Sequence, residues 1–182
     1  MTGLKDASGE PPPIDLDQYV PAYLTWIANK LSRGASQHYL RLFGVGIEAW
    51  RCMVLLATEG AASAQLISRV TGMDKSSVSR CLKSMQDAKL IKTALDPHDG
   101  RARLASLTAK GQAMHDEIRA IALERERSLL SVLSKPEQAE LLRLLRLVHE
   151  NLPAVEEDTS AFIDKKYANR PPGGKRPSER PG

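Results

Sequence analysis

A run of hydroxyl and cationic side chains near the middle of the chain has the chemistry of a surface that binds a polyanion. It reads Lys-Ser-Ser-Val-Ser-Arg-Cys-Leu-Lys over residues 75–83. Short hydroxyls let a backbone approach phosphates, and an arginine guanidinium can hold a guanine edge with two parallel hydrogen bonds. We therefore predict contacts to double-stranded DNA from the following side chains: Lys75, Ser76, Ser77, Ser79, Arg80 and Lys83.

The residues around this run predict the helix that must present it. Asp74 comes directly before it and is a good N-cap, because its carboxylate can accept the free backbone N–H groups of a first helical turn. Val78, Leu82 and Met85 recur at helical spacing and form an apolar stripe. The pattern indicates a helix with one side for the core and a polar side that suits the major groove.

A hairpin is predicted directly downstream of this helix. Two β-like runs, 90–94 and 102–107, flank a turn that contains Pro, Asp and Gly. Arg101 lies at the tip and Arg103 just beyond it, so both are predicted to contact DNA, as arginines do in a minor groove. Each piece alone is more often a merely solvated surface element. The adjacency and order of the two favour DNA binding.

These motifs resemble the core of the MarR family of winged helix-turn-helix regulators. The resemblance runs in register from about Tyr19 to about Leu152, and it is carried by residues 73–85, 90–91, 96–101 and 107–111. It implies a homodimer that binds a short inverted repeat, usually as a repressor that a small ligand releases. The sequence departs from the family pattern at two positions. Lys89 stands where the family often has Gly, and Gly100 where it often has a second Arg.

The rest of the chain predicts a mainly α fold with about six helices and a small antiparallel hairpin. Further helices are expected from near Asp17, from Ile47, over 64–70, over 109–133 and after a capping box at 134–137. The expected organisation has four parts: a flexible arm at 1–14, a helical dimerisation region at 15–46 and 109–155, a winged helix-turn-helix DNA-binding lobe at 47–108, and a disordered basic tail at 169–182.

Two features of the helical region bear on assembly and packing. The last strong helix carries five apolar residues at helical spacing, more than a pair of helices can bury alone: Leu141, Leu144, Leu145, Val148 and Leu152. The stripe predicts pairing with a second copy of the chain. In the first helix, Gly34 costs about 1 kcal/mol relative to Ala, so either another helix packs closely there or a ligand occupies the space.

A pocket for an aromatic or phenolic carboxylate follows from the resemblance. It points to residues on the first two helices: Ser32, Ser36, Tyr39, Trp50 and Arg51. The planar fork of Arg51 matches the two oxygens of a carboxylate. The alternative is that Trp50 belongs to the core and Arg51 forms an internal ion pair.

Two further readings of the sequence stay open. A redox-sensing regulator would use Cys52, which lies in a mostly apolar helix, or Cys81, which lies in the groove-reading helix where oxidation could block DNA. An architectural DNA-binding protein would bind any duplex with similar affinity. Peroxide sensitivity of DNA binding tests the first reading, and competition with random DNA tests the second.

Other classes of protein find little support in the sequence. The four histidines are scattered without metal-ligand spacing, and there is no nucleophile elbow or phosphate-binding glycine loop. We therefore expect no enzyme, cofactor or metal site. A formal charge of +4 suits a polyanion partner. No apolar run approaches the roughly 20 residues that span a bilayer, and no signal core opens the chain, so the cytoplasm is the expected compartment.

Overall fold

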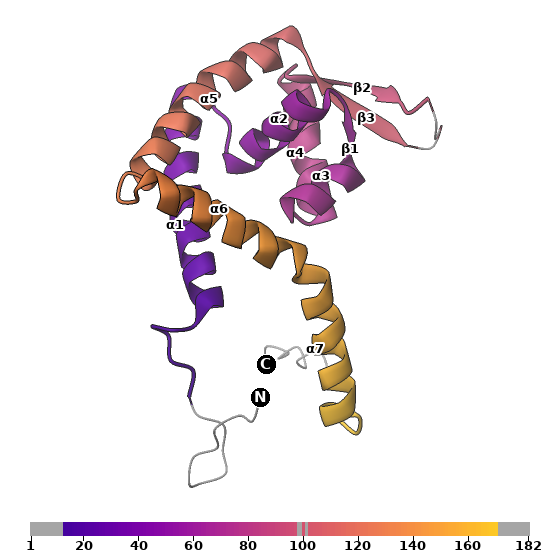
Figure 1. The fold of residues 1–182 in the computed structure, drawn as a ribbon. Helices are drawn as coiled ribbons and strands as arrows, with labels where there is room; N and C mark the ends of the chain where they lie inside the picture. Colours follow the sequence, from indigo (N-terminus) through magenta and orange to yellow (C-terminus); the bar gives the residue numbers. More distant parts are fainter. Residues whose placement is uncertain (1–12, 98–99, 101, 171–182) are drawn as a thin grey trace, which may run out of the picture. The chain divides into compact units, whose positions relative to one another are not determined.

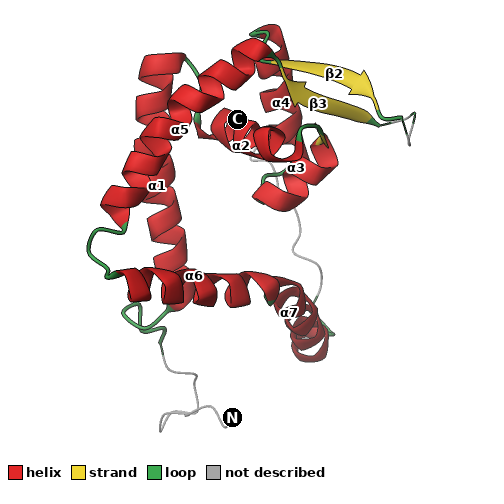
Figure 2. Ribbon diagram, turned by 45° about the horizontal axis from the view of Figure 1, so that its top comes forward, coloured by secondary structure: helices red, strands yellow, loops and turns green. Residues whose placement is uncertain are grey.

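The computed structural model describes residues 13–97, 100 and 102–170. These residues form seven helices and a small antiparallel sheet, which confirms the predicted mainly α class (Figures 1 and 2). They divide into two compact units, one ending at Glu126 and one beginning at Arg127. None of the described helices is long and apolar enough to cross a membrane.

The first unit holds most of the elements, and α5 runs across its boundary. The elements in chain order are α1 (Val20–Phe43), α2 (Ile47–Glu59), β1 (Ala62–Ser63), α3 (Ala64–Thr71), α4 (Lys75–Asp87), β2 (Ile91–Leu95), β3 (Arg103–Leu107) and α5 (Ala109–Leu129). The second unit contains α6 (Lys135–Glu150) and α7 (Leu152–Tyr167).

Side-chain caps start the two helices of the helix-turn-helix, and the cap at Asp74 was predicted. The Ser63 hydroxyl accepts a hydrogen bond from the Leu66 N–H at 3.2 Å and opens α3. The Asp74 carboxylate opens α4 by accepting from the Ser77 N–H at 2.9 Å and the Ser76 hydroxyl at 2.6 Å. These hydrogen bonds, the Ser76 hydroxyl first, hold the pKa of Asp74 well below its usual value.

The predicted hairpin is confirmed, but a third strand was missed. β2 and β3 pair antiparallel, with Thr93 opposite Ala105, and extend away from the helices of their unit (Figure 2). β1 adds to the other edge of β3, with Ala62 also opposite Ala105. A strand of two residues is too short to show the alternation by which strands are recognised in a sequence.

α2 contributes several of the most deeply buried side chains of the first unit. Cys52, Met53 and Leu56 are buried in the core, together with Ile67 of α3 and Val78 of α4. The helix-turn-helix therefore packs against α2 through one side of each of its helices.

A tight junction joins the end of α4 to the hairpin and to α5. Lys89 adopts the left-handed conformation, with φ of 60°, at a position where the family often has Gly. The Thr108 hydroxyl donates to the Lys89 carbonyl at 2.8 Å, and the Thr108 N–H donates to the Leu90 carbonyl at 3.0 Å. Gly111 lies directly against the Leu90 carbonyl, where a Cβ would collide with that oxygen.

The glycine in the middle of α1 makes room for an arginine of α5. A Cβ on Gly34 would lie 3.3 Å from the Arg125 guanidinium. That guanidinium donates to the Leu31 carbonyl at 3.0 Å. A second helix therefore packs closely at Gly34, which is one of the two explanations expected for the cost of a glycine there.

The second unit differs from the prediction in where its helices end. The expected last helix included Leu152, but α6 ends at Glu150, and Leu152 belongs to a further helix, α7. Pro153 lies in the first turn of α7, where its missing N–H is harmless, so it starts a new helix and does not continue α6. The predicted capping box at the start of α6 is confirmed, since the Ser134 N–H donates to Glu137 at 2.7 Å.

Replacing Gly111 with Ala is expected to destabilise the fold by about 1–3 kcal/mol or more, because the new Cβ would force the backbone away from Leu90. Urea unfolding followed by circular dichroism measures the change. Gly100→Ala is the matched control, since a Cβ there meets nothing within 4 Å. Equal stability of the two variants would contradict the close approach.

Replacing Asp74 with Asn keeps an acceptor oxygen but removes the charge that the cap stabilises. Because folding lowers the pKa of Asp74, its contribution to stability is present above its unfolded pKa of about 4 and is lost as the pH falls further. The parent should therefore melt at a higher temperature than Asp74→Asn at pH 6, and the difference should shrink below pH ~4.

Asp87→Asn is the control for this comparison, since it removes a carboxylate at the other end of the same helix, where a negative charge opposes the helix dipole. It should not lower the melting temperature. A difference between parent and Asp74→Asn that is the same at pH 3 and pH 6 would contradict the role of the charged cap.

Candidate nucleic-acid interface

The exposed side of α4 carries the predicted DNA contacts. Ser77 is half-buried, and the other five side chains are exposed: Lys75, Ser76, Ser79, Arg80 and Lys83. Val78, Cys81 and Met85 face the core on the opposite side. The helix therefore presents hydroxyls and cations to solvent while its apolar stripe fixes its rotation.

A hydrogen-bonded network orders the first turn of this surface. The Arg80 guanidinium donates to the Ser76 hydroxyl at 3.1 Å and to the Ser77 hydroxyl at 2.9 Å. The Ser76 hydroxyl in turn donates to Asp74. Arg80 is thus held along the N-terminal turn, where the helix dipole also favours anions. The sequence had suggested these residues but not the network that connects them.

The hairpin supplies the second group of predicted contacts. Arg103 is exposed at the start of β3, opposite Leu95. The Asp96 N–H donates to the Ala102 carbonyl at 2.9 Å and extends the pairing of the two strands toward the tip. Arg101, the other predicted contact, lies outside the described residues.

The predicted effector residues separate into different surroundings. Arg51 donates to the Ser32 hydroxyl at 3.0 Å, and with Trp50 it lines a hollow of about 360 Å³ whose other walls include Val54 and Leu55. Tyr39 is buried, with its ring 5.9 Å from that of Trp50. Burial raises the pKa of Tyr39, against the opposing charge of Arg125.

His115 joins this aromatic group, a position that the sequence did not predict. Its ring stacks on Trp50 at 5.3 Å, and its Nδ1 lies 3.0 Å from the Asp116 carboxylate. The hydrogen bonds from His115 and then Gln112 lower the pKa of Asp116. A histidine 65 residues downstream of a tryptophan gives no local signal that the two rings will meet.

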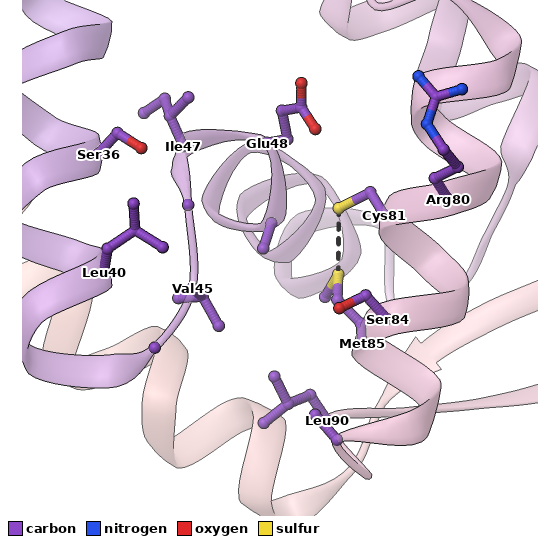
Figure 3. Close-up of a pocket in the computed structure, with 14 residues that line it drawn as sticks. Ser36, Leu40, Val45, Ile47, Glu48, Arg80, Cys81, Ser84, Met85 and Leu90 are labelled. Carbon is purple, nitrogen blue, oxygen red and sulfur yellow. Dashed lines mark hydrogen bonds between the residues drawn. The ribbon is translucent and has the colours of Figure 1, made fainter.

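Ser36 lines a different cavity, of about 520 Å³, which is bordered by α1, the start of α2 and α4 (Figure 3). Glu48, Arg80 and Ser84 provide polar groups in its wall. Cys81 also lines it, with its sulfur directed toward that of Met85 (Figure 3). The predicted residues Ser36 and Arg51 therefore border separate hollows.

The structure brings the two cysteines together, although the sequence suggested only separate roles for them. The Cys52 thiol donates to the Cys81 sulfur at 3.8 Å, and both residues are buried. This contact raises the pKa of Cys52 and lowers that of Cys81, because Cys52 keeps the proton that the pair shares. Burial and the nearby Glu48 carboxylate oppose the charged thiolate at both positions.

Comparison with known proteins identifies the family. A family model described as "MarR family" matches residues 43–102. A crystal structure of a MarR/EmrR family transcriptional regulator from Acinetobacter sp. ADP1 is 31% identical, with a TM-score of 0.72, and covers 78% of this chain and 99% of that one. An HTH-type transcriptional repressor of Mycobacterium tuberculosis is 23% identical over 123 residues, which are 68% of this chain and 88% of the repressor.

A third protein shares the fold at lower identity. A structure of BpsR from Bordetella bronchiseptica has a TM-score of 0.65 at 22% identity, over 76% of this chain and 98% of that one. The family model spans the end of α1, the helix-turn-helix and the strand β2, the same elements that present the polar surface of α4. The chain belongs to the MarR family, whose members are transcriptional regulators and not enzymes.

Proposed function

We propose that the protein is a dimeric, ligand-responsive repressor that places α4 in the major groove of a near-palindromic operator and the β2–β3 hairpin in the adjacent minor groove. The observation that carries this proposal is the exposed surface of α4, whose hydroxyls and Arg80 are ordered by the Asp74 cap. Two such helices in a dimer would meet successive grooves about 34 Å apart. A regulator of this kind acts in the cytoplasm, on the chromosome.

Unburied apolar side chains support pairing with a second copy. Near the start of α1, Tyr23, Trp26 and Ile27 are each more than two-fifths exposed. In the second unit, Leu144 and Leu145 of α6 are exposed to a similar degree. Exposed apolar surfaces of this kind mark protein interfaces. We assign them to the dimerisation region proposed for 15–46 and 109–155.

An aromatic carboxylate is the proposed effector. Arg51 and Trp50 share a hollow with apolar walls, which suits an aromatic ring beside a charged group. BpsR, which has the same fold, is described as regulated in DNA binding by 6-hydroxynicotinic acid, a compound of this class. The dimer would bind the operator only when its two α4 helices have the spacing of successive major grooves. A ligand that binds more tightly to a dimer with a different spacing would weaken operator binding by the ratio of its affinities for the two forms.

Operator binding tests the recognition surface. Arg80→Ala and Arg101→Ala should each lose about 1–3 kcal/mol of operator affinity, and Lys83→Ala should lower the slope of log K against log salt by about 1. Fluorescence anisotropy with the parent's operator and a random duplex measures both quantities. Arg119→Ala, which removes an exposed cation of α5, is the matched control and should bind as the parent does.

Equal affinity of the parent, Arg80→Ala and Arg101→Ala for the operator would contradict the assignment of the recognition surface. Equal affinity of the parent for the operator and for the random duplex would indicate an architectural protein.

Ligand-induced stabilisation tests the effector site. Benzoate-type acids that raise the melting temperature of the parent should bind Arg51→Ala about 10–100-fold more weakly, since a charge-assisted hydrogen bond contributes about 1.5–3 kcal/mol. Arg51→Lys should recover only part of the affinity, because it keeps the charge and loses the fork. If the same acids stabilise parent and Arg51→Ala equally, Arg51 does not bind the carboxylate.

A further inference from the structure

Three sulfur atoms from two helices meet in the core of the first unit. The Cys52 sulfur of α2 lies 3.8 Å from the Cys81 sulfur of α4. The Cys81 sulfur lies 3.8 Å from the Met85 sulfur, one helical turn further along α4. Cys52 and Cys81 are the only two cysteines of the chain. We call Cys52, Cys81 and Met85 the sulfur cluster.

The spacing within the sulfur cluster matches that of sulfurs around one metal ion. A metal about 2.3 Å from each of two sulfurs, at a trigonal or tetrahedral angle, holds those sulfurs about 3.8–4.0 Å apart. The Cys52–Cys81 and Cys81–Met85 separations both have this length. We propose that Cys52, Cys81 and Met85 bind one soft monovalent metal ion of the Cu(I) class.

The donor atoms select this class of ion. Thiolate and thioether sulfur are soft ligands that favour Cu(I), whereas carboxylate and carbonyl oxygen suit Mg²⁺, Ca²⁺ and Mn²⁺. No group of three or more His, Cys, Asp or Glu side chains that could hold a metal occurs in the described part of the chain, so the nitrogen- and oxygen-rich set of a zinc or iron site is not formed there. Three sulfur donors suit an ion that accepts low coordination numbers.

A route to the sulfur cluster leads through the cavity beside α4. Cys81 and Met85 line this cavity (Figure 3). Cys52 does not line it and is fully buried, in contact with Cys81. The Glu48 carboxylate in the same wall provides negative charge that attracts a cation. Binding replaces the two thiol protons, which leave to solvent, and the ion keeps its oxidation state. The bound ion and two thiolates carry a net charge of −1.

The site would connect the helix that carries the proposed DNA contacts to the centre of the core. Cys52 belongs to α2, and Cys81 follows Arg80 directly in α4. An ion shared by these helices would fix α4 to α2 more firmly than the weak S–H contacts do. The metal site itself does not depend on DNA binding, so it can be tested on the protein alone.

Transfer of Cu(I) from a coloured chelator of known affinity tests the site. The reduced full-length protein, kept free of oxygen, should withdraw one Cu(I) per chain and develop the ultraviolet absorption of a copper–thiolate bond. Its melting temperature should rise, and both thiols should become protected from alkylation by iodoacetamide. Failure of the protein to withdraw Cu(I) from the chelator would overturn the proposal. Transfer of Cu(I) without a rise in melting temperature would overturn it too, because thiols of the unfolded chain would then be the ligands.

Variants separate the three donors. Cys81→Ala should abolish transfer, and Met85→Leu, which keeps an apolar side chain of similar size, should weaken Cu(I) binding about tenfold or more. Met53→Leu changes an equally buried methionine of α2 outside the sulfur cluster and should bind Cu(I) as the parent does. If Met85→Leu binds as tightly as the parent, the three-sulfur site is wrong.

Discussion

The carbonyl group of Leu90 is the point on which the DNA-binding unit depends. The Thr108 N–H donates to it at 3.0 Å, and Gly111 leaves the space that this approach requires. Leu90 lies between α4 and β2, while Thr108 lies between β3 and α5. This junction therefore holds together the helix and the hairpin that we propose to contact DNA.

The junction also holds a backbone conformation that the local sequence disfavours. Lys89 has a positive φ although it carries a side chain, which costs energy that a glycine would not. Hydrogen bonds are made on both sides of the Lys89 residue. The Thr108 hydroxyl donates to the Lys89 carbonyl, and the Lys89 N–H donates to the Gln86 carbonyl. The Lys110 ammonium donates to the Ala88 carbonyl at 2.9 Å. Hydrogen bonds from Thr108 and from Lys110 of α5 thus hold the turn in a conformation that the local sequence disfavours.

The features that a sequence could predict are those that depend on near neighbours. The caps at Ser63 and Asp74 and the strands on either side of the turn follow from residues a few positions apart. β1 could not be predicted, since its two residues form a strand only by pairing with β3, some 40 residues later. The mid-helix Gly34 predicted either a closely packed helix or space for a ligand. Only the fold reveals that Arg125 lies there, bound to a carbonyl 94 residues away in the sequence. The same holds for the stack of Trp50 on His115.

The two opposite sides of α4 carry the residues of the two proposed sites, the sulfur cluster and the DNA contacts. Val78, Cys81 and Met85 follow each other at spacings of three and four, so they share the inner side, while Ser76, Arg80 and Lys83 share the outer side at the same spacings. Arg80 and Cys81 are adjacent in sequence and therefore point in different directions from one backbone. Any change that rotates α4 to improve contacts among the sulfur atoms must also rotate Arg80 and the serines that hold it. The core side and the surface proposed to bind DNA are therefore joined through the backbone of one helix.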